Sequence, residues 1–143
     1  MPRAVLDTTV LVSAFLSARP GGAAFELLQF AFEERFELLL SEPILTEVAD
    51  VLLTRPHLRT RYRYTDNAVA TYVNGLRRAA TLVSDLPHLS VVRDKADDII
   101  LATAVAAAAD YLCTRDKDLL DLRRYREIAI LSPEDLLAVI RAI

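Results

Sequence analysis

The chain has 143 residues, of which 53% are apolar and 26% are charged, and it contains only 3 glycines and 6 prolines. This composition excludes a disordered, collagen-like or low-complexity chain, and the length predicts one domain over residues 1–143. The net charge of −3 means that the protein as a whole does not attract polyanions, so that any polyanionic partner must bind at a local site.

The apolar segments are too short for membrane insertion. The longest uncharged runs fall well below the roughly 20 residues that cross a bilayer. At the amino end, Asp7 interrupts the apolar residues that follow Arg3, so no signal-peptide core is present. We therefore expect a cytoplasmic protein with no membrane partner.

Short apolar runs alternate with segments of helical spacing along the first half of the chain. The apolar runs predict strands at residues 4–6 and 36–40. The helical spacing predicts helices at residues 10–17, at 23–34, and from the cap Ser41 to just before Pro56. The stretch Arg19-Pro20-Gly21-Gly22 separates the first two helices.

The same alternation continues after a basic and aromatic segment at residues 55–64. Thr65 is predicted to cap a helix with the apolar face Val69, Tyr72, Val73 and Leu76. Further strands are predicted at residues 81–83, 111–113 and 128–131, and further helices at 99–109, 117–122 and 133–142. This order predicts an α/β fold with a short, mainly parallel central sheet and helices on both faces.

Four acidic residues are predicted to share one edge of this sheet. Asp7 and Asp116 follow strands, Glu47 lies early in the helix after the second strand, and Asp98 begins the helix before residues 111–113. Ligand sites of parallel sheets gather beyond the carboxyl ends of the strands. Converging carboxylates need a cation to offset their repulsion, and oxygen ligands select Mg²⁺ or Mn²⁺ over zinc.

Each acid also has an ordinary structural explanation. Aspartates at strand ends and helix starts commonly act as caps, which would explain Asp7, Asp98 and Asp116. Glu47 would be unremarkable on a solvated helix face. It is the combination of the four that favours a functional site.

Three segments in order, VLDTTVLVSA, SEPILTEV and DKADDIILATAVAAAADYLCTRDKDLL, resemble PIN-domain proteins, particularly the VapC-like toxin branch. The resemblance covers nearly the whole chain. It implies a three-layer α/β/α fold and a metal-dependent ribonuclease, commonly neutralised by a small antitoxin and usually dimeric. It places the acids of the family on Asp7, Glu47, Asp98 and Asp116, with Asp97 and Asp118 as neighbours that assist them.

Several details around the acids differ from the family pattern or are left open by it. Many members carry asparagine where this chain has Thr9. The stretch DKADD permits either Asp97 or Asp98 as the ligand, and we favour Asp98 because it directly precedes IILATA. Ser13 and Thr114 match positions where small hydroxyl residues support the site, although ordinary backbone hydrogen bonding would explain both.

These features lead to a hypothesis for the chemistry. Asp7, Asp98 and Asp116 would hold one or two Mg²⁺ or Mn²⁺ ions, and Glu47 would bind a second ion or orient the attacking water. RNA would be bound by the basic and aromatic segment, through Arg55, His57, Arg59, Arg61 and Arg63 interleaved with Tyr62 and Tyr64. A solvated helix face, or a clamp for an acidic partner segment, would explain the same run.

Other functions fit the sequence less well. A phosphatase of the haloacid dehalogenase type needs a second aspartate at the position of Thr9, and the 3 glycines form no phosphate-binding loop. With only 2 histidines, a zinc site or a serine-histidine triad has little support. A receiver-type signalling domain would need a lysine near the last strand, where none occurs. The main alternative is a non-catalytic RNA- or protein-binding domain, against which the presence of all four acids argues.

Overall fold

A computed structural model describes residues 1–17 and 22–143, so that most of the predicted break at Arg19-Pro20-Gly21-Gly22 lies outside the described residues. Its centre is a six-stranded sheet in the order β3-β2-β1-β4-β6-β5. The strands are β1 (Arg3–Leu6), β2 (Glu37–Leu40), β3 (Thr81–Leu82), β4 (Tyr111–Cys113), β5 (Arg124–Tyr125) and β6 (Ile128–Leu131). All neighbours pair in parallel except β5 and β6, which confirms the mainly parallel sheet.

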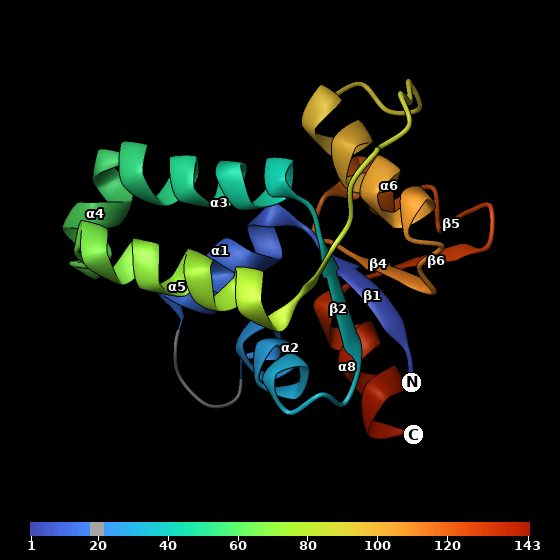
Figure 1. Cartoon of the computed structure of the whole chain (residues 1–143), viewed down its shortest axis with the longest axis horizontal. Coiled ribbons are helices and arrows are strands. Elements are labelled where there is room, and N and C mark those ends of the chain that lie inside the picture. The colour runs from blue at the N-terminus through green and yellow to red at the C-terminus, as the bar shows by residue number, and fades with distance from the viewer. Residues whose placement is uncertain (18–21) are drawn as a thin grey trace.

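Helices cover both faces of the sheet, so the predicted three-layer α/β/α fold is confirmed. In Figure 1, α6 lies over one face, while α2 and α8 pack together on the other. α3 and α5 run side by side away from the sheet and are joined by α4. The helices are α1 (Thr8–Leu16), α2 (Ala23–Phe32), α3 (Glu42–Thr54), α4 (Pro56–Tyr62), α5 (Asp66–Ala79), α6 (Lys95–Ala106), α7 (Lys117–Leu120) and α8 (Pro133–Arg141).

The two central strands of the sheet, β1 and β4, determine where the segments that follow them leave it. β1 and β2 are apolar on both faces because helices cover both sides of a parallel sheet, and Val5, Leu39 and Leu40 are fully buried. β1 and β4 pair with Leu6 opposite Cys113. The residues that follow these two strands therefore emerge side by side at the same edge of the sheet.

Two elements were not predicted from the sequence. The segment at residues 55–64 forms the short helix α4, which has no buried residue, with Pro56 tolerated in its first turn. β5 has only two residues, too few to show an alternating pattern, and it pairs antiparallel with β6. Arg123 and Arg126, which flank β5, have left-handed backbone conformations (φ 61° and 54°) that turn the chain on either side of it.

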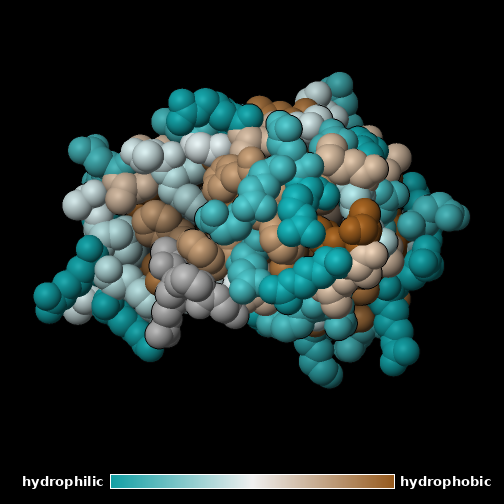
Figure 2. All heavy atoms as spheres, turned by 90° about the horizontal axis from the view of Figure 1, so that it is seen from below, coloured by the Kyte–Doolittle hydropathy of each residue, from teal (hydrophilic) through white to brown (hydrophobic). Residues whose placement is uncertain are grey.

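The surface on the side of α2 and α8 is mixed in character. Figure 2 shows hydrophilic side chains projecting around apolar residues that remain partly visible between them. Among the helices in the described residues, none combines the length and the apolar character needed to cross a membrane.

Candidate active site

Asp7 is held in place as soon as the chain leaves β1. Its carboxylate caps α1 by accepting the Val10 N–H at 3.0 Å, and it accepts the Thr9 hydroxyl at 2.7 Å. The Thr114 hydroxyl donates to its other oxygen. Burial raises the pKa of Asp7, which is only 3% exposed, although these three hydrogen bonds act in the opposite direction. Asp7 is thus a buried, oriented carboxylate at the carboxyl edge of the sheet.

Thr114 also connects Asp7 to Asp116. Thr114 follows β4 and is fully buried, and its hydroxyl oxygen accepts the backbone N–H of Asp116 at 2.9 Å. Asp116 in turn caps α7 by accepting the Asp118 N–H at 2.7 Å. One threonine therefore positions two acids that are 109 positions apart in the sequence numbering, counted from Asp7 to Asp116.

Asp97, in the first turn of α6, completes this group, which we call the acidic trio (Asp7, Asp97 and Asp116). Burial raises the pKa of Asp97 to about 7, together with the charge of Asp116, a hydrogen bond to it, and the charges of Asp94 and Asp7. Among the ion pairs within residues 1–17 and 22–143, none includes a member of the trio. Within the described part of the chain, the negative charge gathered here therefore has no ion-pair partner.

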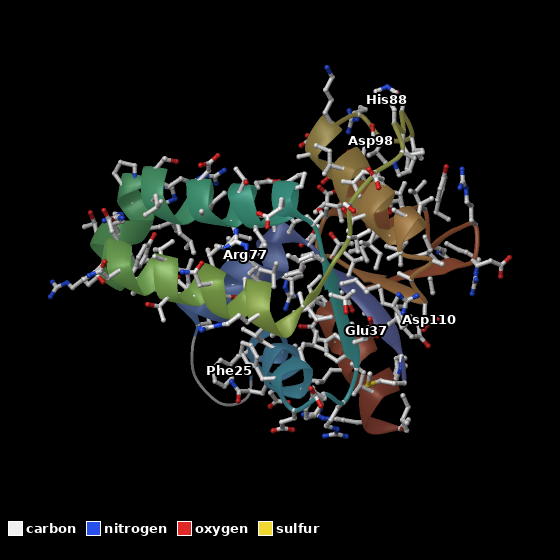
Figure 3. All side chains as sticks on the ribbon, in the orientation of Figure 1. Phe25, Glu37, Arg77, His88, Asp98 and Asp110 are labelled. Atoms are coloured by element: carbon white, nitrogen blue, oxygen red, sulfur yellow. The ribbon has the colours of Figure 1, made fainter. Side chains whose placement is uncertain are left out.

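The structure does not place Asp98 with the trio, contrary to our preference for Asp98 over Asp97. Asp98 is 8% exposed and accepts the backbone N–H groups of Val91 and Val92 at 2.9 and 3.0 Å. Figure 3 shows it near the start of α6, beside the loop that carries His88. Successive helical residues point about 100° apart, so that only one of the two neighbours can face Asp116.

Helical spacing alone does not distinguish these neighbours. Leu101, Ala102 and Ala104 are buried, and α6 packs on β1, β2 and β4. Asp97 precedes Leu101 by four residues, and Asp98 precedes Leu101 by three and Ala102 by four, so the spacing assigns both acids to the face that meets the sheet. That Asp98 directly precedes the apolar run does not tell which way its side chain points.

Glu47 lines a cavity next to the trio. It is half-buried on α3 and lines a cavity of about 310 Å³, together with Thr9 and Ser13 of α1. Because Thr9 also contacts Asp7, the cavity adjoins the trio. The carboxylate of Asp118 pairs instead with Arg93 at 3.3 Å, and only its backbone N–H serves the trio, through Asp116.

The side chains of the basic and aromatic segment at residues 55–64 have different surroundings. Arg55 and His57 line the cavity together with Tyr62. Arg59 forms an ion pair with Asp66 and lies over the Tyr64 ring at 5.6 Å. The other predicted RNA-binding residues, which are not among those lining the cavity, are Arg61, over the ring of Tyr62, and Arg63, at the left-handed end of α4.

The chemistry of the trio fits a hard divalent cation. Its donors are carboxylate oxygens, the ligands that Mg²⁺ and Mn²⁺ prefer, and Asp97 and Asp116 interact with no cationic partner within residues 1–17 and 22–143. In the part of the chain that the structure describes, no group of three or more His, Cys, Asp and Glu side chains is arranged so that it could hold a metal ion, so the fit of the trio is one of donor chemistry. Both oxygens of Asp7 are engaged by Thr9, Val10 and Thr114.

The pKa of Asp97 leads to a prediction for the metal-free protein. Its pKa in the folded state, about 7, lies above the ordinary value of 3.8, so the folded state binds more protons between these pH values. The free energy of unfolding should therefore fall as the pH rises through this window. Asp97→Asn should flatten this dependence, as measured by urea unfolding in EDTA at several pH values. Asp118→Asn is the matched control, and an unchanged slope in Asp97→Asn would contradict the assignment.

Comparison with known proteins identifies the family. The family model described as "PIN domain" matches residues 3–118, and no curated protein sequence matches the chain. VapBC2 from Rickettsia felis, solved bound to a promoter DNA fragment, is similar with a TM-score of 0.60 at 12% identity, over 90% of this chain and 97% of that chain. FitAcB from Neisseria gonorrhoeae has a TM-score of 0.49 at 17% identity, over 92% and 98%. Because the family model spans most of its length, this chain belongs to the PIN domain family.

Proposed function

We propose that this protein is a divalent-metal-dependent endoribonuclease that serves as the toxin of a toxin–antitoxin pair. PIN domains are generally nucleases, and those nucleases usually use divalent metals. The observation that carries the proposal is the meeting of Asp7, Asp97 and Asp116 at one edge of the sheet, where no other described residue forms an ion pair with them. The similarity to VapBC2 supports a small antitoxin as the partner.

In this proposal the acidic trio holds the metal. A bound Mg²⁺ or Mn²⁺ supplies an activated water and neutralises charge at the phosphate. Thr114 keeps Asp7 and Asp116 in register, since its hydroxyl bonds to both residues. Thr9 fixes Asp7 from the other side. Glu47, on the wall of the adjoining cavity, orients the attacking water.

The test is cleavage of an end-labelled single-stranded RNA by purified protein. We expect endonucleolytic products with Mg²⁺ or Mn²⁺, none in EDTA, and recovery when the metal is returned in excess. Asp7→Asn, purified in the same way, controls for contaminating ribonuclease. Cleavage that persists in EDTA would contradict the metal assignment, and binding without any cleavage would favour the non-catalytic alternative.

A further inference from the structure

Arg115 forms an ion pair that joins the two connections leaving β4 and β6. The Nη1 and Nη2 groups of its guanidinium donate to the two carboxylate oxygens of Glu134 at 3.1 and 2.7 Å. Such a two-point contact fixes orientation as well as distance. Glu134 lies in the first turn of α8, shortly after β6. Because β4 and β6 are parallel neighbours, with Cys113 opposite Leu131, both connections emerge at the edge of the sheet that carries the acidic trio.

With this ion pair, the turn between β4 and α7 is held from both sides. On the side of β1, the Thr114 hydroxyl donates to Asp7. On the side of β6, Arg115 bonds to Glu134. The next residue, Asp116, donates its backbone N–H to the Thr114 hydroxyl and belongs to the trio. The turn that presents Asp116 is therefore fastened to the connections that follow both neighbouring strands.

The exposure and the surroundings of Arg115 indicate a local role. Its side chain is 46% exposed and that of Glu134 is 58% exposed, so the pair contributes little to the stability of the whole fold. Among the described residues, Arg115 forms no ion pair with the trio. The hydrogen bond to Glu134 raises the pKa of the Arg115 guanidinium, and the charge of Asp7 adds to this effect. The guanidinium thus lies within electrostatic range of the trio without binding to it.

We propose that Arg115 is a positioning residue: its pairing with Glu134 fixes the turn that presents Asp116, and thereby raises the affinity of the acidic trio for a divalent cation. This inference rests on the proposed function. The charge of Arg115 by itself would act in the opposite direction, because a positive group beside the trio repels a metal ion. The two effects predict opposite signs for the change in metal affinity when the Arg115 side chain is removed.

The experiment compares Arg115→Ala, Glu134→Gln and the double variant with the wild type. Mn²⁺ affinity is measured from the rise in melting temperature during a Mn²⁺ titration, and amide hydrogen exchange of residues 114–118 is measured separately in EDTA. Arg141→Ala is the matched control, because Arg141 pairs with Glu26 of α2 and its side chain is 54% exposed. It removes a similar ion pair at the opposite end of the same helix, α8.

We expect Arg115→Ala to weaken Mn²⁺ binding about fivefold, the scale of an exposed two-point ion pair, although it removes a positive charge. Glu134→Gln should weaken binding to a similar extent. The double variant should bind no more weakly than either single variant, because both substitutions break the same ion pair. In EDTA, the amides of Asp116 and Asp118 should exchange faster in these variants, and at the wild-type rate in Arg141→Ala.

Unchanged or tighter Mn²⁺ binding by Arg115→Ala would overturn the positioning role, and so would exchange of residues 114–118 at the wild-type rate. A wild-type protein whose melting temperature does not respond to Mn²⁺ would instead count against the proposed metal-dependent nuclease. The exchange measurement would still decide whether Arg115 holds the turn, because it is made without metal.

Discussion

Asp97→Asn is expected to lower metal-dependent RNA cleavage by about 10³-fold, because losing a charged ligand removes several kcal/mol of transition-state stabilisation. Asp98→Asn should keep the cleavage rate within about tenfold of the wild type. It should lower the free energy of unfolding instead. Asp98 accepts two backbone N–H groups from the loop before α6, and an amide oxygen accepts them more weakly than a carboxylate. We expect a loss of about 1–2 kcal/mol in the free energy of unfolding.

The two variants form a matched pair, because each replaces one carboxylate by an amide at neighbouring positions of the same helix. Single-turnover cleavage of one RNA and urea unfolding in EDTA give the two readouts. Asp97→Asn should be inactive and at least as stable as the wild type, since it relieves repulsion with Asp116. The opposite pattern, with Asp98→Asn inactive and Asp97→Asn active, would show that Asp98 and not Asp97 is the metal ligand.

Mn²⁺ is expected to stabilise the folded protein by about 2.7 kcal/mol when it is present at 100 times its Kd, because it binds the assembled trio and not the unfolded chain. Asp7→Asn should lose most of this stabilisation while keeping the fold. Asparagine caps helices about as well as aspartate, and its amide oxygen can still accept the Thr9 hydroxyl and the Val10 N–H.

Thermal unfolding with EDTA and with increasing Mn²⁺ measures this effect without any RNA. Asp118→Asn serves as the control and should respond to Mn²⁺ as the wild type does, since its carboxylate pairs with Arg93 outside the trio. If Asp7→Asn gained as much stability from Mn²⁺ as the wild type, the metal would bind elsewhere.

The fold could be predicted from the sequence because it depends on local patterns of apolar and capping residues. Apolar runs too short for helices marked β1, β2, β4 and β6, and capping residues marked the starts of α5 and α8. Asp7 and Asp116 could be assigned to one edge without coordinates, because parallel strands end on the same side. β5 and α4 escaped prediction because each is short and largely exposed, and therefore leaves little hydrophobic pattern.

By itself, then, the amino-acid sequence determined the fold class and led to the prediction that acids gather at the carboxyl edge of the sheet. Only the tertiary structure decided which acids meet: Asp97 interacts with Asp116, Asp98 holds the preceding loop, and Glu47 lines the adjoining cavity. The physical reason is that a carboxylate's direction depends on the rotation of its helix and on hydrogen-bond partners distant in sequence. Thr114, which bonds to Asp7 across the β1–β4 pair, is such a partner, and only the resemblance to the family pattern pointed to it in the sequence.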